Sequence, residues 1–197
     1  MFGSGVTLNS VISGLESEMD IAIPIEKERY IEWINSLEQL LYREVIKEQA
    51  ECVIEIPEGA VLDLSRMRLP DDRDSLYFED IYAVFADEKQ LIKTSLASGK
   101  IFPDCFFKDE NKMGYSLSGN PSDFRIIYTV RPKPKVTGEE IIMLPVEFVE
   151  LAKAKLRGEA YKLANEDALA AKWLNDYNVL LETFKAWISG KAPEFGL

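Results

Sequence analysis

Carboxylate side chains between residues 71 and 80 are the groups in this sequence whose spacing comes closest to a chemical site. Asp71, Asp72 and Asp74 stand together in a charged segment, and carboxylate oxygens are the ligands that hard divalent cations prefer. The segment lacks the spacing and the glycine of an EF-hand loop, so a solvated loop is favoured over a metal site. Glu79 and Asp80 are adjacent in a predicted strand, where neighbouring side chains point to opposite faces, and this disfavours a joint acid–base role.

The residue types that most catalytic sites need are missing from the chain. It contains no histidine, which removes the commonest general base and excludes the Ser-His-Asp and Cys-His arrangements. Neither of the glycine-rich phosphate-binding motifs is present. Cys52 and Cys105 are far apart and form no CxxC pattern, which favours two reduced cysteines. We therefore expect no enzymatic activity, no metal and no cofactor, and a metal-dependent hydrolase is the least favoured hypothesis.

Three aromatic residues of a predicted strand could bind a ligand. Tyr77, Phe78 and Tyr82 lie close together in the sequence and could form a platform for a sugar ring or a base, although packing within a sheet is the favoured interpretation. The platform is the basis of an alternative function, a carbohydrate- or ligand-binding accessory domain. This alternative predicts a monomer that responds to added glycans.

Two apolar features are candidates for contacts with other protein chains. Phe106 and Phe107 are adjacent in a predicted strand, so one must face away from the other and is a candidate for a subunit interface. The last residues, 189–197, contain too much glycine and proline for a helix, yet they carry Phe195 and Leu197. Such a tail, which also contains Lys191, is typical either of docking onto a partner or of a frayed end.

The composition is that of an acidic globular chain. The 197 residues are 47% apolar and 11% aromatic, which is enough for a hydrophobic core, and 23 basic against 34 acidic residues give a net charge of −11. Because such a chain repels phosphate, sequence-specific binding of DNA or RNA is excluded, whereas acidity suits a surface that nucleic acid passes without sticking. No apolar run approaches the length of a membrane span, and no contact with a membrane is expected.

Helical periodicity dominates both ends of the chain. Thr7 is the predicted N-cap of a short helix, and a long helix is predicted over 26–48. A pair of helices is predicted over 144–188, with Pro145 at its start and a break at Asn165. Its short connection makes the two helices antiparallel. The predicted core of the resulting bundle consists of Tyr30, Ile34, Leu37, Leu41, Leu156, Trp173, Tyr177 and Phe184.

Between the helices the apolar period changes to two, which is typical of strands. Alternation along the strand predicted at 77–85 places Tyr82 and Val84 on one face and Ile81 and Ala83 on the other. Pro132 is expected to end the sheet, because proline cannot donate to a ladder. The predicted strands cover residues 54–56, 77–85, 88–94, 104–108, 115–117 and 124–131.

This order of elements predicts an α+β fold. Helices, then strands, then helices argue for an antiparallel helical bundle with a small antiparallel sheet inserted in it. The bundle is predicted to consist of residues 1–52 and 141–197, and the β insertion of residues 53–140.

The helical segments resemble the head-to-tail adaptor proteins of tailed bacteriophages. The resemblance is carried by Leu144–Phe148 (LPVEF), by the alanine-rich helix Leu151–Ala164, and by the helix with Trp173 and Tyr177 after a short acidic break. The helix with Trp33-Ile34-Asn35 is similar to the first long helix of that family. A β insertion between these helices is also similar to the adaptors of short-tailed phages, and the resemblance covers about half of the chain.

The resemblance implies a structural protein of the virion neck rather than an enzyme. Adaptors of this kind assemble as rings, typically dodecamers, below the portal protein. They extend the DNA channel and offer a platform for tail nozzle and fibre proteins, so DNA would only pass through. The resemblance also implies that the tail with Lys191, Phe195 and Leu197 docks into clefts between portal subunits.

Overall fold

A computed structural model describes residues 4–21, 23–56, 59, 61–64, 76–95 and 102–190, and only the backbone of residues 76 and 77. The chain divides into two compact units, each described here by itself: a helical unit of Met1–Ile46 and Pro134–Leu197, and a β unit of Lys47–Lys133. These boundaries lie six or seven residues before the predicted ones. At the first boundary the reason is that the chain is already in a strand of the β unit at Gln49.

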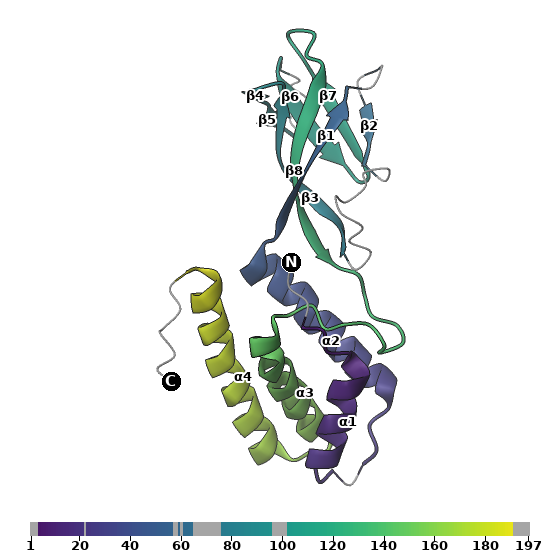
Figure 1. Cartoon of the computed structure of the whole chain (residues 1–197), viewed down its shortest axis with the longest axis vertical. Coiled ribbons are helices and arrows are strands. Elements are labelled where there is room, and N and C mark those ends of the chain that lie inside the picture. Colours follow the sequence, from purple (N-terminus) through teal and green to yellow (C-terminus); the bar gives the residue numbers. More distant parts are fainter. Residues whose placement is uncertain are drawn as a thin grey trace. The chain divides into compact units, whose positions relative to one another are not determined.

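The fold is α+β, as predicted, with helices and strands in separate units (Figure 1). The helical unit begins with α1 and α2 and is completed after the β unit by α3 and α4, which lie side by side (Figure 1). None of the described helices is long and apolar enough to cross a membrane. The helical elements are α1 (Leu8–Glu18), α2 (Lys27–Leu41), the π-helical turn η1 (Tyr42–Ile46), the 3-10 turn η4 (Val146–Phe148), α3 (Val149–Leu163) and α4 (Asp167–Ile188).

Local signals fix the ends of these helices. The Thr7 side chain accepts a hydrogen bond from the Ser10 N–H at 3.3 Å, which confirms the predicted N-cap. Asn165 has a φ of 60°, and this left-handed residue separates α3 from α4 as predicted. The helix predicted over 26–48 is wrong at its C-terminal end, because α2 stops at Leu41 and passes into η1. Lys47 then takes a φ of 49°, and β1 follows.

One apolar cluster holds the helical unit together. It includes residues from α1, α2, α3 and α4, and the predicted short helix contributes all four of its apolar positions. Seven of the eight predicted core residues belong to the cluster, and Trp173 packs at its margin. The seven are Tyr30, Ile34, Leu37, Leu41, Leu156, Tyr177 and Phe184.

A buried ion pair ties the returning chain to α2. The side chains of Glu38 and Lys135 are 1% and 2% exposed, and Lys135 Nζ donates to Glu38 Oε2. Glu38 Oε1 also accepts the backbone N–H of Met143 at 2.8 Å. Asn35 accepts the Lys135 N–H at 2.7 Å and donates to the Lys135 carbonyl at 2.9 Å. These bonds satisfy both buried charges and hold the chain across α2.

The β unit consists of two four-stranded sheets rather than the single small sheet predicted. The first sheet has the order β1-β8-β3-β4 and is antiparallel; the second has the order β2-β7-β6-β5, with β5 parallel to β6. The rings of Tyr115 and Phe124, one from each sheet, meet edge to face with centroids 4.8 Å apart. The strands are β1 (Gln49–Glu55), β2 (Val61–Asp63), β3 (Leu76–Ala86), β4 (Lys89–Gln90), β5 (Ile92–Lys93), β6 (Cys105–Asp109), β7 (Lys112–Ser116) and β8 (Asp123–Pro132).

The strand predicted at 88–94 is split because its two halves pair with different sheets. The Leu91 N–H donates to the Val84 carbonyl in the first sheet, at 2.8 Å, and the Ile92 N–H donates to the Asp104 carbonyl in the second, at 2.9 Å. The segment therefore crosses from one sheet to the other within one residue.

The predicted alternation along β3 is also wrong, because the strand is bulged. Its register against β8 shifts between Phe78 and Asp80 and again between Ile81 and Ala83. Each bulge inserts an unpaired residue and reverses the parity of the faces beyond it. Tyr82 is accordingly 64% exposed, whereas Val84, predicted to share its face, is fully buried.

Candidate functional site

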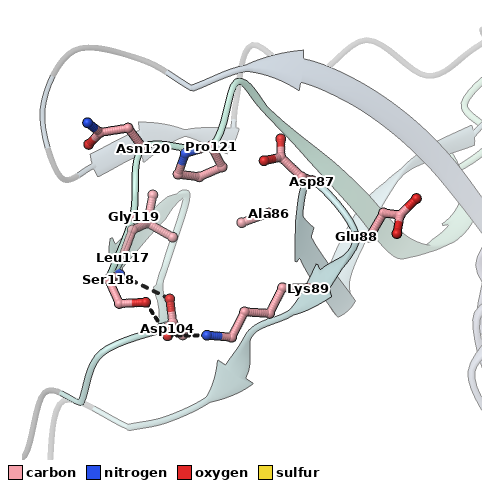
Figure 2. Close-up of a pocket in the computed structure, with 10 residues that line it drawn as sticks. All are labelled: Ala86, Asp87, Glu88, Lys89, Asp104, Leu117, Ser118, Gly119, Asn120 and Pro121. Atoms are coloured by element: carbon pink, nitrogen blue, oxygen red, sulfur yellow. Dashed lines mark hydrogen bonds and ion pairs between the residues drawn. The ribbon is translucent and has the colours of Figure 1, made fainter.

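A pocket of about 370 Å³ lies where three loops of the β unit meet (Figure 2). One side of the pocket is lined by residues 86–89, at the turn between β3 and β4. Asp104, directly before β6, and the loop between β7 and β8 line the remainder. The β7–β8 loop lines it with Leu117, Ser118, Gly119, Asn120 and Pro121.

The carboxylates of this pocket are used to hold its loops together. Asp104 accepts hydrogen bonds from Lys89 Nζ at 2.5 Å, from Ser118 Oγ at 2.6 Å and from the Ser118 N–H at 3.0 Å. The bond from Lys89, followed by those from Ser118, lowers the pKa of Asp104 to about 2, so this carboxylate stays ionised. Asp87 accepts the Ser122 N–H and hydroxyl at 3.1 Å each. Both carboxylates therefore serve to join the loops that line the pocket.

A second hollow, of about 350 Å³, runs between α3 and α4. Its apolar lining comes from Ala154 of α3 and from Trp173, Val179 and Leu180 of α4. Its polar lining consists of Glu150, Arg157 and Asp176. A lining that mixes apolar and charged side chains in this way is typical of a surface that contacts a protein.

Trp173 lies at this hollow and not in the core where it was predicted. It is only partly buried, and the Arg157 guanidinium lies 4.5 Å from the centroid of its ring. Arg157 is also paired with Glu18 of α1, and burial lowers the pKa of its guanidinium. Arg157 therefore links α1 to the tryptophan ring at the hollow, through an ion pair on one side and a cation–π contact on the other.

The predicted interface pair divides between the interior and the surface. Phe106 is 1% exposed and belongs to the core of the β unit. Phe107 is half-buried, and its ring lies over Gly114, where an added Cβ would come within 2.1 Å of it. Gly114 lies within β7, and close packing by the Phe107 ring is what requires a glycine there.

The predicted aromatic platform is not assembled by the residues that the structure describes. Phe78 is half-buried and its ring contacts Tyr128, with centroids 5.6 Å apart, while Lys108 Nζ lies 5.2 Å from its centroid. Tyr82 is exposed beyond the bulge that follows Phe78. The side chain of Tyr77 is outside the described part of the chain.

Some predicted residues cannot be compared with the structure. Asp71, Asp72 and Asp74, and the tail residues Lys191, Phe195 and Leu197, all lie outside the described residues. Within the described ranges, no group of three or more histidine, cysteine, aspartate or glutamate side chains could hold a metal ion. Glu79 and Asp80, the adjacent carboxylates, form separate ion pairs with Arg131 and with Lys93 and Lys108.

The pair Glu38 and Lys135 was missed by the sequence interpretation. A signal for Glu38 was present, because it stands four residues after Ile34 on the apolar stripe of α2, where a charged side chain must find a partner. Lys135 stands on no apolar stripe that would have indicated its burial. Its role depends on a contact that spans 97 residues of sequence.

No known protein family matches this sequence, and no curated protein is significantly similar to it.

Proposed function

We propose that the chain is a structural subunit of a bacteriophage neck, a head-to-tail adaptor that forms a ring between the portal and the tail. One observation carries this proposal: α4 leaves much of its apolar surface uncovered. Its buried residues, Ala170, Tyr177 and Phe184, are seven residues apart, and its other large apolar residues, including Trp173 and Leu180, pack on the core only in part or are exposed. An amphipathic helix that is satisfied within its own unit normally buries a wider stripe.

Several apolar side chains of α4 are exposed or only partly buried, and three of them, Trp173, Val179 and Leu180, line the hollow between α3 and α4. Val179 is 60% exposed and Leu169 37% exposed, and Trp173 and Leu180 are only partly covered. These four side chains form the uncovered row of α4, and exposed apolar side chains that lie together are typical of a protein contact rather than of a solvated face. In a ring, different patches of one subunit meet head to tail, so the row would be covered by a neighbouring copy.

Two sequence features agree with this assembly. The helical segments that carry the adaptor resemblance include Trp173 and Tyr177 of α4, so the uncovered row lies on a helix through which that resemblance runs. The net charge of −11 suits a channel wall along which DNA slides, because like charge prevents adhesion. The proposed partners are therefore a portal protein, tail proteins and further copies of the chain, with localisation in the virion neck.

The test is oligomeric state, measured by sedimentation velocity over a concentration series and after mixing with the portal protein encoded in the same genome. We expect rings visible by negative-stain microscopy, and we expect Val179→Glu to abolish them without changing the melting temperature. Val61→Glu is the matched control, since Val61 is 53% exposed in β2 of the β unit. A chain that stays monomeric alone and with the portal protein contradicts the proposal, as does a Val179→Glu variant that still forms rings.

A further inference from the structure

Strand β1 leaves one side of its backbone unpaired by any described strand. It is the end strand of the first sheet, and its other side pairs with β8 over all seven residues without a register shift. The Val130 N–H donates to the Glu48 carbonyl and the Ile56 N–H donates to the Ser122 carbonyl, one at each end of the strand. Hydrogen-bonded pairs alternate along an antiparallel ladder. The N–H and C=O groups that point away from β8 are therefore those of Gln49, Glu51, Val53 and Glu55.

The other described edges of the two sheets have features that prevent a further strand from pairing with them, and β1 lacks these features. β2, β4 and β5 have only three, two and two residues. The edge of β3 beyond β4 carries two bulges, and lysines cover two of its carbonyls: Lys108 Nζ donates to that of Glu79 at 2.9 Å and Lys93 Nζ to that of Ile81 at 3.1 Å. Short strands, bulges and lysines prevent further strands from adding to a sheet. The seven regular residues of β1 lack these three devices.

We propose that β1 is a docking edge, at which an extended basic segment of another protein adds to the sheet as a further strand. Main-chain hydrogen bonds would supply the affinity, and the side chains of β1 would select the sequence. This interaction surface goes beyond the proposed ring contact, since it lies in the β unit and the ring contact is assigned to α4.

The side chains of β1 define the chemistry of the partner. Glu51, Val53 and Glu55 alternate along the strand and share one face of the sheet, and Val53 is 62% exposed. The Arg125 side chain neutralises part of this charge, at 3.5 Å from Glu51. Opposite charges on paired residues of neighbouring strands stabilise a sheet. The complementary strand therefore carries lysine or arginine at two positions four residues apart, with an apolar residue midway between them.

The same side chains disfavour a second copy of this chain as the occupant. Two β1 strands paired antiparallel about Val53 would place Glu51 of each opposite Glu55 of the other, and like charges directly opposite are destabilising. The lysines of β4 and β5 are already engaged: Lys89 with Asp104, and Lys93 with Asp80. A basic segment of a different protein is the occupant that fits the charge of β1.

The test uses the full chain and a synthetic peptide, acetyl-TKTVTKT-amide, in a nuclear magnetic resonance titration. We expect the backbone N–H signals of Glu51, Val53 and Glu55 to shift and their hydrogen exchange to slow. The peptide acetyl-TETVTET-amide is the charge control and should bind at least about tenfold more weakly, a difference of about 1.4 kcal/mol. Equal binding of the two peptides, or shifts confined to other strands, would overturn the proposal.

Variants of β1 separate strand addition from simple charge attraction. Val53→Pro removes an outward N–H and spares the ladder with β8, so peptide binding should fall by about tenfold or more, as for the loss of a hydrogen bond. Val53→Thr keeps the N–H and should bind as the unchanged chain does. If the proline variant does not fold, the double variant Glu51→Lys/Glu55→Lys decides, because it should prefer the acidic peptide. Val179→Glu should leave peptide binding unchanged, so this proposal and the ring proposal can fail separately.

Discussion

One ion pair of the helical unit and one cluster of ion pairs in the β unit lie in opposite environments. In the helical unit, Glu38 and Lys135 are withdrawn from water, with side chains 1% and 2% exposed. In the β unit, Asp80 is 47% exposed, and its partners Lys93 and Lys108 remain in contact with solvent. Both arrangements contain a carboxylate and an ammonium group within hydrogen-bonding distance, so the difference between them is the environment and not the chemistry.

The loss of one charge should cost more stability at the buried Glu38 pair than at the exposed pairs of Asp80. Burial raises the pKa of Glu38 against the opposing influence of Lys135, which indicates that the ionised carboxylate is costly at this place. Removing one partner would leave the other charge buried and unpaired. At Asp80 water can replace a lost partner, and exposed pairs contribute little. The predictions below test this contrast, in order of expected effect.

Glu38→Leu should have the largest effect, a loss of about 3–5 kcal/mol in the free energy of unfolding, because Lys135 would remain buried without its partner. The double variant Glu38→Leu/Lys135→Met should recover most of this loss. Urea denaturation followed by tryptophan fluorescence is a suitable measurement, since all three tryptophans, at positions 33, 173 and 187, lie in the helical unit. If the single variant loses less than about 1 kcal/mol in the free energy of unfolding, the buried pair is no more sensitive to the loss of a charge than the exposed pairs are.

Leu37→Ala should cost about 2–5 kcal/mol, the range for truncation of a buried leucine. Leu37 is 2% exposed and immediately precedes Glu38 on α2, so this variant compares apolar and charged burial in one helical turn. Leu40→Ala is the control, because Leu40 is 43% exposed and should lose less than about 1 kcal/mol. Similar losses at Leu37 and Leu40 would show that the cost of truncating a leucine in this helix does not depend on its burial.

Glu140→Gln should cost about 1–2 kcal/mol at neutral pH, as the loss of hydrogen bonds to a charged group does. The Glu140 carboxylate accepts the backbone N–H groups of Val136, Thr137 and Gly138. Partial burial would raise its pKa, but the bonds from Val136 and Thr137 outweigh this and lower the pKa to about 2. Glu140 is thus intermediate between Glu38 and Asp80: its carboxylate is partly buried and accepts several backbone hydrogen bonds.

The pH dependence of this variant has a defined sign. A carboxyl whose pKa is lower in the folded state stabilises the fold above its unfolded pKa, near 4.3, and loses that contribution as the pH falls through the folded pKa. The difference between the unchanged chain and Glu140→Gln should therefore be constant from about pH 6 to 8 and shrink between about pH 4.3 and 2. Urea denaturation at a series of pH values measures it. A difference that grows on acidification contradicts the assignment.

Asp80→Asn should have the smallest effect, below about 1 kcal/mol, because the pairs with Lys93 and Lys108 are exposed and the amide oxygen can still accept the Ile81 N–H. Urea denaturation followed by the backbone N–H signals of β3 and β8 in nuclear magnetic resonance reports on the β unit, which has no tryptophan. A loss as large as that of Glu38→Leu would mean that solvent does not compensate this pair.

Features that depend on neighbours along the chain were predictable from the amino-acid sequence. The helical stripe of α2 and the cap at Thr7 follow from contacts within one or two turns. The strand predicted over 124–131 is present as β8, and its alternate residues Phe124, Ile126, Tyr128 and Val130 are buried. The α+β class follows from the order of these elements.

Tertiary structure decided the features that depend on a distant partner. Tyr82 is exposed and Val84 is buried because β3 has bulges in its pairing with β8. The bulges depend on how the two strands pair, and not on β3 alone. Phe106 is buried because β6 forms part of the core of the β unit. Glu38 has an opposite charge beside it in the interior because Lys135, 97 residues away, returns to α2. Local sequence sets which face of an element is apolar, whereas the desolvation of a group depends on which distant atoms replace the water around it.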